Sequence, residues 1–327
     1  MFRLPALELG WLIPALVFTI ANGVIAFAIL PSGAQFFGGL QILPVWMVMV
    51  ALFIAFQFTS QGFVLSISGR KEEAPEARDW LAANYAHPGR FLIFMFIAGA
   101  NMVAFLWIKP VLNIAIPFTA DPLLVDIDNA LFFGHDAWIF VSWANFSFAN
   151  QLYHPIWFAL MIIALMILFA APSSPKKSAM ALSYFLLWSV LGPLVHWAFP
   201  AGGPVFFERL GYGDRFAQLD GGERTRIVSD MLWNFYSSGQ FQPAAGISAM
   251  PSMHVTMSTW TVLCFVYFQP RWRVPVGLTS LYIAILSVAL GWHYAVDGIV
   301  GAVLATVTFF LCLKLFESSA RNREAPC

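Results

Sequence analysis

Charged residues are scarce in this chain. Only 10% of its 327 residues are Asp, Glu, Lys or Arg, whereas 60% are hydrophobic. Soluble domains carry roughly a quarter charged residues, and a soluble fold could not bury this much apolar surface. The formal net charge is zero, so the composition gives no indication of a nucleic-acid partner. The sequence therefore excludes an ordinary soluble enzyme and predicts an integral membrane protein.

Cysteine is also rare. Cys264 and Cys312 lie inside apolar runs, and Cys327 is the last residue. Their spacing matches neither a disulfide framework nor a cysteine metal site. We therefore expect neither feature to organise the fold.

Eight apolar runs have about the 20 residues that a helix needs to cross a bilayer. They cover residues 9–30, 41–68, 91–116, 153–171, 178–199, 253–270, 273–291 and 297–316. The short alternating segments of a membrane barrel are absent, so helices must satisfy the backbone in lipid. The predicted fold class is all-α, a polytopic transmembrane helical bundle of about eight spans. The first run is too long for a cleavable signal peptide, and we expect it to be retained.

A charged stretch divides the chain. We predict an accessory N-terminal helix pair at residues 1–69, a cytoplasmic charged linker at 70–90, a six-helix catalytic core at 91–316 and a cytoplasmic tail at 317–327. Residues 121–143 are partly apolar but acidic, so we expect this segment to be interfacial or re-entrant instead of spanning. No internal repeat is visible.

Basic residues are unequally divided between the two sides that eight spans define. One side has Arg3, Arg70, Lys71, Arg78, Arg90, Lys176, Lys177, Arg271, Arg273, Lys314, Arg321 and Arg323; the other has Arg209, Arg215, Arg224 and Arg226. The richer side, with both termini, should be cytoplasmic. The long polar segments 117–152 and 200–252 lie opposite and exceed simple turns in length. We expect the functional site on that extracytoplasmic side.

Two short segments on this side have residues suited to phosphate chemistry. One ends at His254, at the start of the sixth run, and the other contains His293 and Asp297, between the seventh and eighth runs. The two runs between the histidines form an antiparallel pair, so both histidines should lie at similar depth. His293 and Asp297 are four residues apart, and on a helix they share one face.

This arrangement suits attack on phosphorus. A carboxylate partner fixes the tautomer of an imidazole and stabilises its protonated form. A second histidine can protonate the departing alkoxide. Ser252 precedes His254 at a helix start marked by Pro251, where free N–H groups bind phosphate. We therefore predict Ser252 as a phosphate-binding residue.

The two motifs carry a family resemblance. Pro251-Ser252-Met253-His254 and His293-Tyr294-Ala295-Val296-Asp297 resemble the type 2 phosphatidic acid phosphatase superfamily, over roughly residues 90–316. The resemblance implies that His293 is the nucleophile, that Asp297 orients it and that His254 is the general acid. It implies a phosphohistidine route with no metal and no cofactor, in a lipid phosphatase or phosphotransferase. The substrate would be a lipid phosphate or phospholipid, and the acceptor water, an alcohol or a lipid.

The chain also departs from the usual pattern of that family. Met253 replaces a glycine, Ser287 replaces an arginine, and the Lys-x6-Arg-Pro segment is absent. Because of these departures and the segment Gly202–Arg209, the chain resembles the branch that contains inositol phosphorylceramide synthase more than it resembles the soluble acid phosphatases. Cations that offset phosphate charge must then come from elsewhere. We predict Lys109 and Arg209 as phosphate ligands, although Lys109 could equally extend its amine to the interface.

Other interpretations remain open at this point. A transporter or binding protein without catalysis could use intramembrane charges to line a path, although such proteins often show repeats. A zinc site could use His254, His293, Asp297 and Glu208, but the sequence offers no tighter ligand spacing. A serine hydrolase with Ser252 as nucleophile would lack the Gly-x-Ser-x-Gly turn. His135, His154 and His196 are expected to be structural, and the loop arginines solvated or paired.

Compartment follows from orientation. We predict a bacterial plasma membrane with the site facing outward, because no eukaryotic retention signal is evident at the terminus. A Golgi-like membrane with a lumenal site is the alternative. The lipid, the head group and the oligomeric state do not follow from the sequence.

Overall fold

The computed structural model describes residues 4–30, 36–85 and 87–324. All regular elements within these ranges are helical. Seven of the helical segments are long and apolar enough to cross a membrane, and α11 is a shorter apolar helix of 16 residues. Arg3, the side chain of Arg323, and the end of the predicted tail, with Cys327, lie outside the described part. The predicted polytopic helical bundle is confirmed.

The eight apolar runs correspond to these helices. They are α1 (Ala6–Ile29), α2 (Ile42–Ile67), α4 (Pro88–Ala115), α7 (Ser147–Ala170), α8 with α9 (Pro175–Leu186 and Gly192–Ala198), α11 (Met253–Phe268), α12 (Arg273–Ala289) and α13 (Ala295–Glu324). A π-helical turn, Leu187–Leu191, joins α8 to α9. The remaining elements are α3 (Ala77–Asn84), α5 (Asp121–Leu131), α6 (Ala137–Val141), α10 (Gly222–Ser238) and the short 3-10 turns Phe36–Gln41, Lys71–Glu73, Ser142–Ala144, Pro204–Phe206 and Pro270–Trp272.

Local sequence explains several helix boundaries. Proline opens α4 and α8, where its missing N–H group is not needed. The Ser174 side chain accepts a hydrogen bond from the Lys177 N–H at the start of α8. At the C-terminal end of α10, Gly239 takes the left-handed conformation that ends many helices.

Helix α11 packs against α7, α12 and α13, while α8 packs against α13 and α1. Helix α4 packs against α1, α2 and α7. The core between them is aromatic, with Trp11, Trp188 and Trp260 almost completely buried. Trp260 also donates a hydrogen bond from Nε1 to the Met180 carbonyl, 3.1 Å away, so its polar atom is satisfied in the apolar interior.

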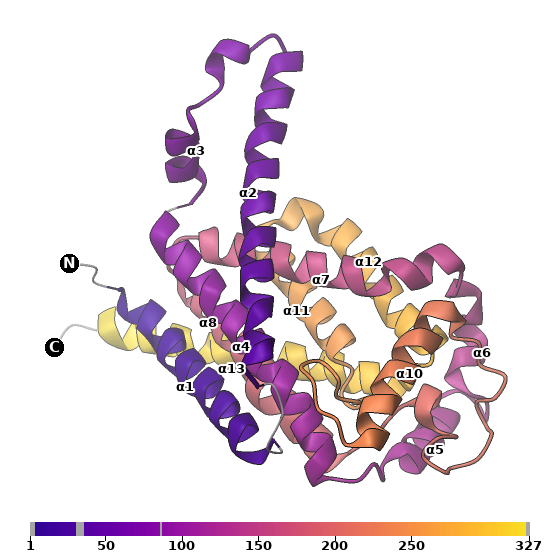
Figure 1. Ribbon diagram of the computed structural model, residues 1–327. Coiled ribbons are helices and arrows are strands. Elements are labelled where there is room, and N and C mark those ends of the chain that lie inside the picture. Colours follow the sequence, from indigo (N-terminus) through magenta and orange to yellow (C-terminus); the bar gives the residue numbers. More distant parts are fainter. Residues whose placement is uncertain (1–3, 31–35, 86, 325–327) are drawn as a thin grey trace.

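Helix α1 is joined to α8 by polar contacts inside the bundle. Lys177 Nζ lies 3.0 Å from Glu8 Oε1, and both side chains are at most 5% exposed. Trp11 donates to the same carboxylate, and Ser178 donates to the Leu7 carbonyl at 3.0 Å. Helix α2 packs mainly on α4, and its far half projects with α3 from the body (Figure 1). The division into an accessory pair and a six-helix core stays a prediction.

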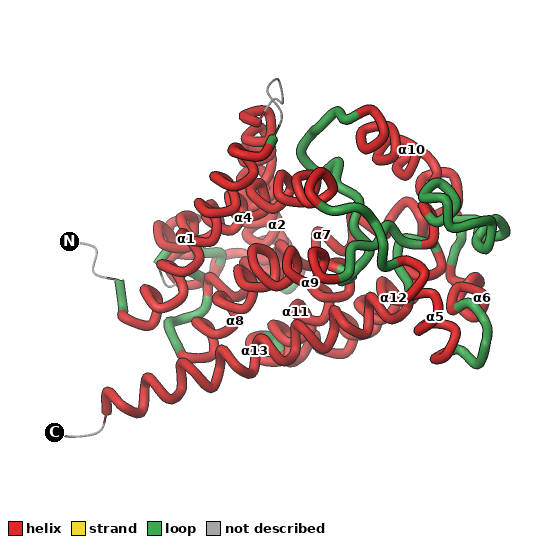
Figure 2. Tube along the Cα trace, turned by 90° about the horizontal axis from the view of Figure 1, so that it is seen from below, coloured by secondary structure: helices red, strands yellow, loops and turns green. Residues whose placement is uncertain are grey.

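The described ends of the chain lie together at one end of the bundle (Figure 1). Most long loops gather at the other end, around α5, α6 and α10 (Figure 2). Helix α5 has 11 residues and α6 has five, which is too short to span a bilayer. This agrees with the expectation that residues 121–143 do not span. The expected functional segments therefore share one end, opposite the termini.

Candidate active site

A cavity of about 550 Å³ lies at the loop-rich end of the bundle. Five cationic or titratable side chains line its polar part, and they come from α4, α7, α10, α11 and the turn before α13: Lys109, His154, Arg224, His254 and His293. Segments far apart in sequence thus bring their polar side chains to one space. The cavity contains both histidines that the motifs predict.

His293 lies in the turn between α12 and α13 and is only 4% exposed. Its Nδ1 atom is 2.8 Å from the Ala249 carbonyl oxygen and 3.5 Å from Asp297 Oδ2. A carbonyl oxygen can only accept, so Nδ1 carries the proton and Nε2 keeps its lone pair. The imidazole is therefore held in the tautomer in which Nε2 can act as a nucleophile or base.

Asp297 is fully buried in the first turn of α13. Its Oδ2 atom accepts a hydrogen bond from the Tyr294 N–H at 2.9 Å. This contact resembles a capping box, in which a side chain bonds back to an N–H group at the helix start. Asp297 thus fixes the turn that carries His293 as well as facing its ring.

His254 is the second residue of α11 and is partly buried. Its ring centroid is 5.8 Å from that of His293, 5.1 Å from His154, 4.9 Å from Tyr153 and 4.4 Å from Trp157. Trp157 also donates from Nε1 to the His254 carbonyl at 3.1 Å. Aromatic neighbours therefore hold the second motif histidine beside the first.

Ser252 is completely buried and caps α11. Its Oγ atom accepts from the Val255 N–H at 3.3 Å, and its own N–H donates to the Asp297 carbonyl at 3.1 Å. The residue joins the starts of α11 and α13, through its side chain on α11 and its backbone N–H on α13, and it is not part of the cavity lining. Its role as a phosphate ligand stays a prediction.

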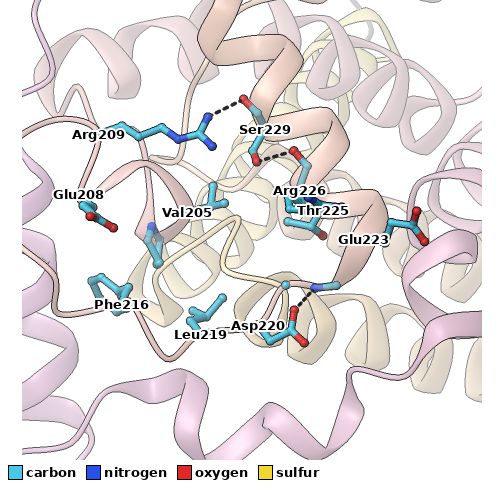
Figure 3. A pocket seen from close by; sticks show the side chains of 13 residues that line it. Val205, Glu208, Arg209, Phe216, Leu219, Asp220, Glu223, Thr225, Arg226 and Ser229 are labelled. Atoms are coloured by element: carbon cyan, nitrogen blue, oxygen red, sulfur yellow. Dashed lines mark hydrogen bonds between the residues drawn. The ribbon is translucent and has the colours of Figure 1, made fainter.

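The structure separates the two cations expected to bind phosphate. Lys109 lines the histidine cavity, but Arg209 lines a second pocket of about 460 Å³ (Figure 3). Arg209 pairs with Asp230, donates to the Ser229 carbonyl at 3.4 Å, and lies over the Trp233 ring. It is therefore already occupied by contacts outside the histidine cavity.

Arg224 and His154 occupy the cavity instead, although sequence reasoning did not select them. Arg224 was one of four arginines on the same side, and His154 was expected to be structural. His154 and Arg224 line the same cavity as Lys109 and His293, so these groups gather in one space. The available signal was that both residues lie in or next to the segments predicted to face the extracytoplasmic side. Only the tertiary packing of α7 and α10 distinguishes them from their neighbours.

The other part of the cavity is apolar. Side chains of spanning helices and of α10 form it, including Ile42, Met102, Phe105, Leu106, Trp157, Phe158, Trp188, Val228, Met231 and Leu232. The cavity therefore combines a cationic and histidine-rich end with an apolar end. Such a shape suits a molecule with an anionic group and a hydrocarbon part.

Among the residues that the structure describes, no group of three or more His, Cys, Asp or Glu side chains has the geometry to hold a metal ion. Glu208, the carboxylate in the zinc alternative, lines the second pocket with Arg209 (Figure 3). The structure therefore does not assemble the four ligands of that alternative.

Comparisons with known proteins agree with the motifs. Inositol phosphorylceramide synthase of Candida albicans is 26% identical over 154 residues, which are 46% of this chain and 32% of that protein. The match thus spans about a third of the length of this curated relative. No solved structure matches the chain. The family profile described as PAP2 superfamily matches residues 122–311, more than half of the chain and including both histidine motifs. The chain therefore belongs to the PAP2 superfamily, with inositol phosphorylceramide synthase among its relatives.

Proposed function

We propose that this protein is an integral membrane lipid phosphatase or phosphotransferase that acts on a phosphate ester at the extracytoplasmic face, with His293 as the nucleophile. One observation carries the proposal. His293 Nδ1 is held between the Ala249 carbonyl and Asp297, beside His254, in a cavity that is cationic at one end and apolar at the other. Family membership and the name of the relative support the same class of chemistry.

The reaction divides into two displacements. In the first, the Nε2 lone pair of His293 forms a bond to phosphorus while the bond from phosphorus to the alkoxide leaving group breaks. His254 gives its proton to that alkoxide oxygen. The product is an alcohol and a phosphorylated histidine, and Asp297 stabilises the positive charge that develops on the imidazole.

In the second displacement, neutral His254 takes the proton of water or of an acceptor alcohol. The acceptor oxygen forms a bond to phosphorus, and the bond between phosphorus and His293 Nε2 breaks. Water gives hydrolysis and an alcohol gives transfer, because the same intermediate serves both. With a phosphate monoester the transferred unit is a phosphoryl group, and with a phospholipid it is a phospho-alcohol.

Cations must offset the charge on the phosphoryl oxygens in the transition state. Lys109 and Arg224 line the cavity with the histidines, so we assign this role to them. In this proposal Arg224 takes the place that the sequence suggested for Arg209. The apolar lining from α2, α4, α7 and α10 would receive the hydrocarbon part of the lipid.

The test compares purified wild type with His293→Ala in detergent, on a panel of lipid phosphates and phospholipids, with and without chelator. Released phosphate and new lipid products are measured. We expect wild-type turnover that chelator leaves unchanged, and no turnover by a folded His293→Ala variant. His135→Ala is the matched control, because this histidine is exposed in the loop between α5 and α6.

Three results would contradict the proposal. Full activity of His293→Ala would exclude this nucleophile, and loss of turnover with chelator would require a metal. Absence of product from every lipid in the panel would favour the alternative of a transporter or binding protein without catalysis.

A further inference from the structure

Helix α5 has two buried carboxylates on one face, outside the histidine motifs. Asp121 is 0% exposed and Asp128 is 4% exposed. They are seven residues apart, or about two helical turns, so their side chains leave the helix in the same direction. Asp126, between them, is exposed on another face. Two buried carboxylates in an 11-residue helix need an explanation, because burying a charge is costly unless it is hydrogen-bonded.

Asp128 caps the start of α13 from a different helix. Its Oδ2 accepts from the Ala295 N–H at 2.7 Å, and its Oδ1 accepts from the Val296 N–H at 2.8 Å. The first N–H groups of a helix have no partner within the helix, and the dipole favours a negative charge there. Both capped residues lie between His293 and Asp297. The carboxylate therefore holds the short segment that carries the nucleophile and its partner.

Asp121 holds the residue next to the nucleophile. Its Oδ1 accepts from the Tyr294 hydroxyl at 2.8 Å and from the Gly203 N–H at 2.8 Å, and its Oδ2 accepts from the Gly202 N–H at 2.9 Å. Tyr294 is 2% exposed and follows His293 directly. One carboxylate thus ties the Gly202–Gly203 turn to the motif turn.

Close packing of that turn adds to the constraint. Gly203 has a φ of +98°, and a Cβ atom placed there would lie 2.6 Å from the Trp292 carbonyl oxygen. Glycine is required at this position because only it tolerates both the conformation and the approach. The turn therefore packs directly on the residue before His293.

All the donors to these two carboxylates are neutral. Burial raises the pKa of Asp121, and the hydrogen bonds from Gly202, Gly203 and Tyr294 oppose that rise. Burial likewise raises the pKa of Asp128, the N–H groups of Ala295 and Val296 oppose it, and nearby Asp136 adds to it. The ionised forms accept all five hydrogen bonds, so the geometry itself favours charge on both groups.

We propose that Asp121 and Asp128 are positioning residues for the nucleophile: from α5 they clamp residues 293–297 so that His293 Nδ1 stays between Ala249 and Asp297. The inference rests on the proposed function of His293. Neither carboxylate lines the cavity, so neither contacts substrate. They act through the backbone of the motif turn.

The test uses Asp128→Asn, with Asp126→Asn as the matched control on the same helix. Asparagine keeps the shape, but its amide N–H₂ faces one of the two N–H donors, so one hydrogen bond is replaced by a repulsive contact. Misplacement of a reacting group by about 1 Å can cost about 100-fold in rate. We expect kcat to fall about 10- to 100-fold with KM within about twofold, and Asp126→Asn to match wild type.

A double-substitution cycle distinguishes positioning from general stability. If Asp128 acts through the 293–297 segment, Asp128→Asn should add little to the loss caused by Asp297→Asn, because both disturb the same group. Multiplicative losses would overturn the proposal. Should Asp128→Asn not fold, Tyr294→Phe serves instead, since it removes only the hydroxyl that binds Asp121.

Hydrogen exchange provides a readout that does not depend on catalysis. In Asp128→Asn we expect amide exchange at residues 291–298 to be about tenfold faster, which corresponds to one lost hydrogen bond, with no change in Asp126→Asn. Faster local exchange in a protein that turns over no lipid would support the contact of α5 with residues 293–297 but reject the proposed function. Unchanged exchange and unchanged kcat in an active enzyme would reject the clamp alone.

Discussion

At the scale of single residues, spacing in the sequence was informative only where the partners are close along the chain. His293 and Asp297 were expected to face each other from their four-residue separation, and the structure brings Nδ1 and Oδ2 to 3.5 Å. The nearer partner of Nδ1 is the Ala249 carbonyl. Every residue has a backbone carbonyl, so the sequence does not indicate which carbonyl binds His293, and this contact could not have been predicted.

The predicted phosphate ligands likewise depend on contacts between residues that are distant in the chain. Arg209 and Arg224 are alike in type and in expected side, and hydropathy cannot rank them. The difference arises from tertiary structure, because Arg209 pairs with Asp230 whereas Arg224 turns into the histidine cavity from the first turn of α10. Choosing between them required the placement of α10 against α7.

This difference gives a prediction at residue scale. Arg224→Gln should lower kcat/KM about 100-fold, because loss of one charge-stabilising donor costs on the order of 10²–10³ in rate. Arg209→Gln should stay within about twofold of wild type, since exposed ion pairs contribute little. Steady-state product release on the best lipid substrate measures both. A larger loss in Arg209→Gln would restore the original expectation for that residue.

At the scale of elements, the apolar runs predicted the spanning helices because bilayer thickness fixes their length. Irregular features were beyond such reasoning. The π-helical turn Leu187–Leu191 lies inside one continuous apolar run, and nothing in hydropathy marks it. Asn22 of α1 donates to the Ser189 carbonyl in this turn at 3.1 Å, so a partner distant in sequence satisfies the interrupted helix.

Helix α1 provides a prediction at this scale. Removing one partner of a buried ion pair leaves an uncompensated charge and typically costs about 3–5 kcal/mol. We therefore expect Lys177→Met to lower the midpoint of thermal unfolding in detergent, and the double variant Glu8→Gln with Lys177→Met to recover most of the loss. Catalytic activity should follow stability, because α8 packs against α13.

The exposed pair Arg70–Glu73 is the matched control. Glu73→Gln should not change the midpoint measurably, since solvent screens such pairs. If Lys177→Met unfolds at the wild-type temperature, α1 does not depend on this contact. The packing of α1 on α4 and α8 would then hold this helix without the ion pair.

At the scale of the whole molecule, the span count predicts where the two chain ends lie. The number of spans places both termini on one side, and the described ends do lie together, opposite the loops (Figures 1 and 2). Lys and Arg are enriched on the terminal side, which predicts that this side is cytoplasmic. The orientation itself stays a prediction.

Labelling of single cysteines tests that orientation. In a background with the native cysteines replaced, Ala217→Cys and Glu72→Cys each place a thiol at an exposed position. The first lies in a segment predicted to be extracytoplasmic, and the second in the linker predicted to be cytoplasmic. We expect a membrane-impermeant maleimide to label Ala217→Cys in intact bacterial cells and Glu72→Cys only after lysis. The reverse pattern would place the histidine cavity in the cytoplasm.

The apolar half of the histidine cavity has a consequence for how the enzyme would meet its substrate. Residues of the spanning helices α2, α4 and α7, with Trp188 of the π-helical turn, form much of that lining, so a lipid would arrive by lateral diffusion within the bilayer. Its effective concentration is then the mole fraction among neighbouring lipids instead of its amount per volume of buffer. Adding inert lipid or detergent dilutes the substrate in two dimensions, and apparent affinities scale with that surface dilution.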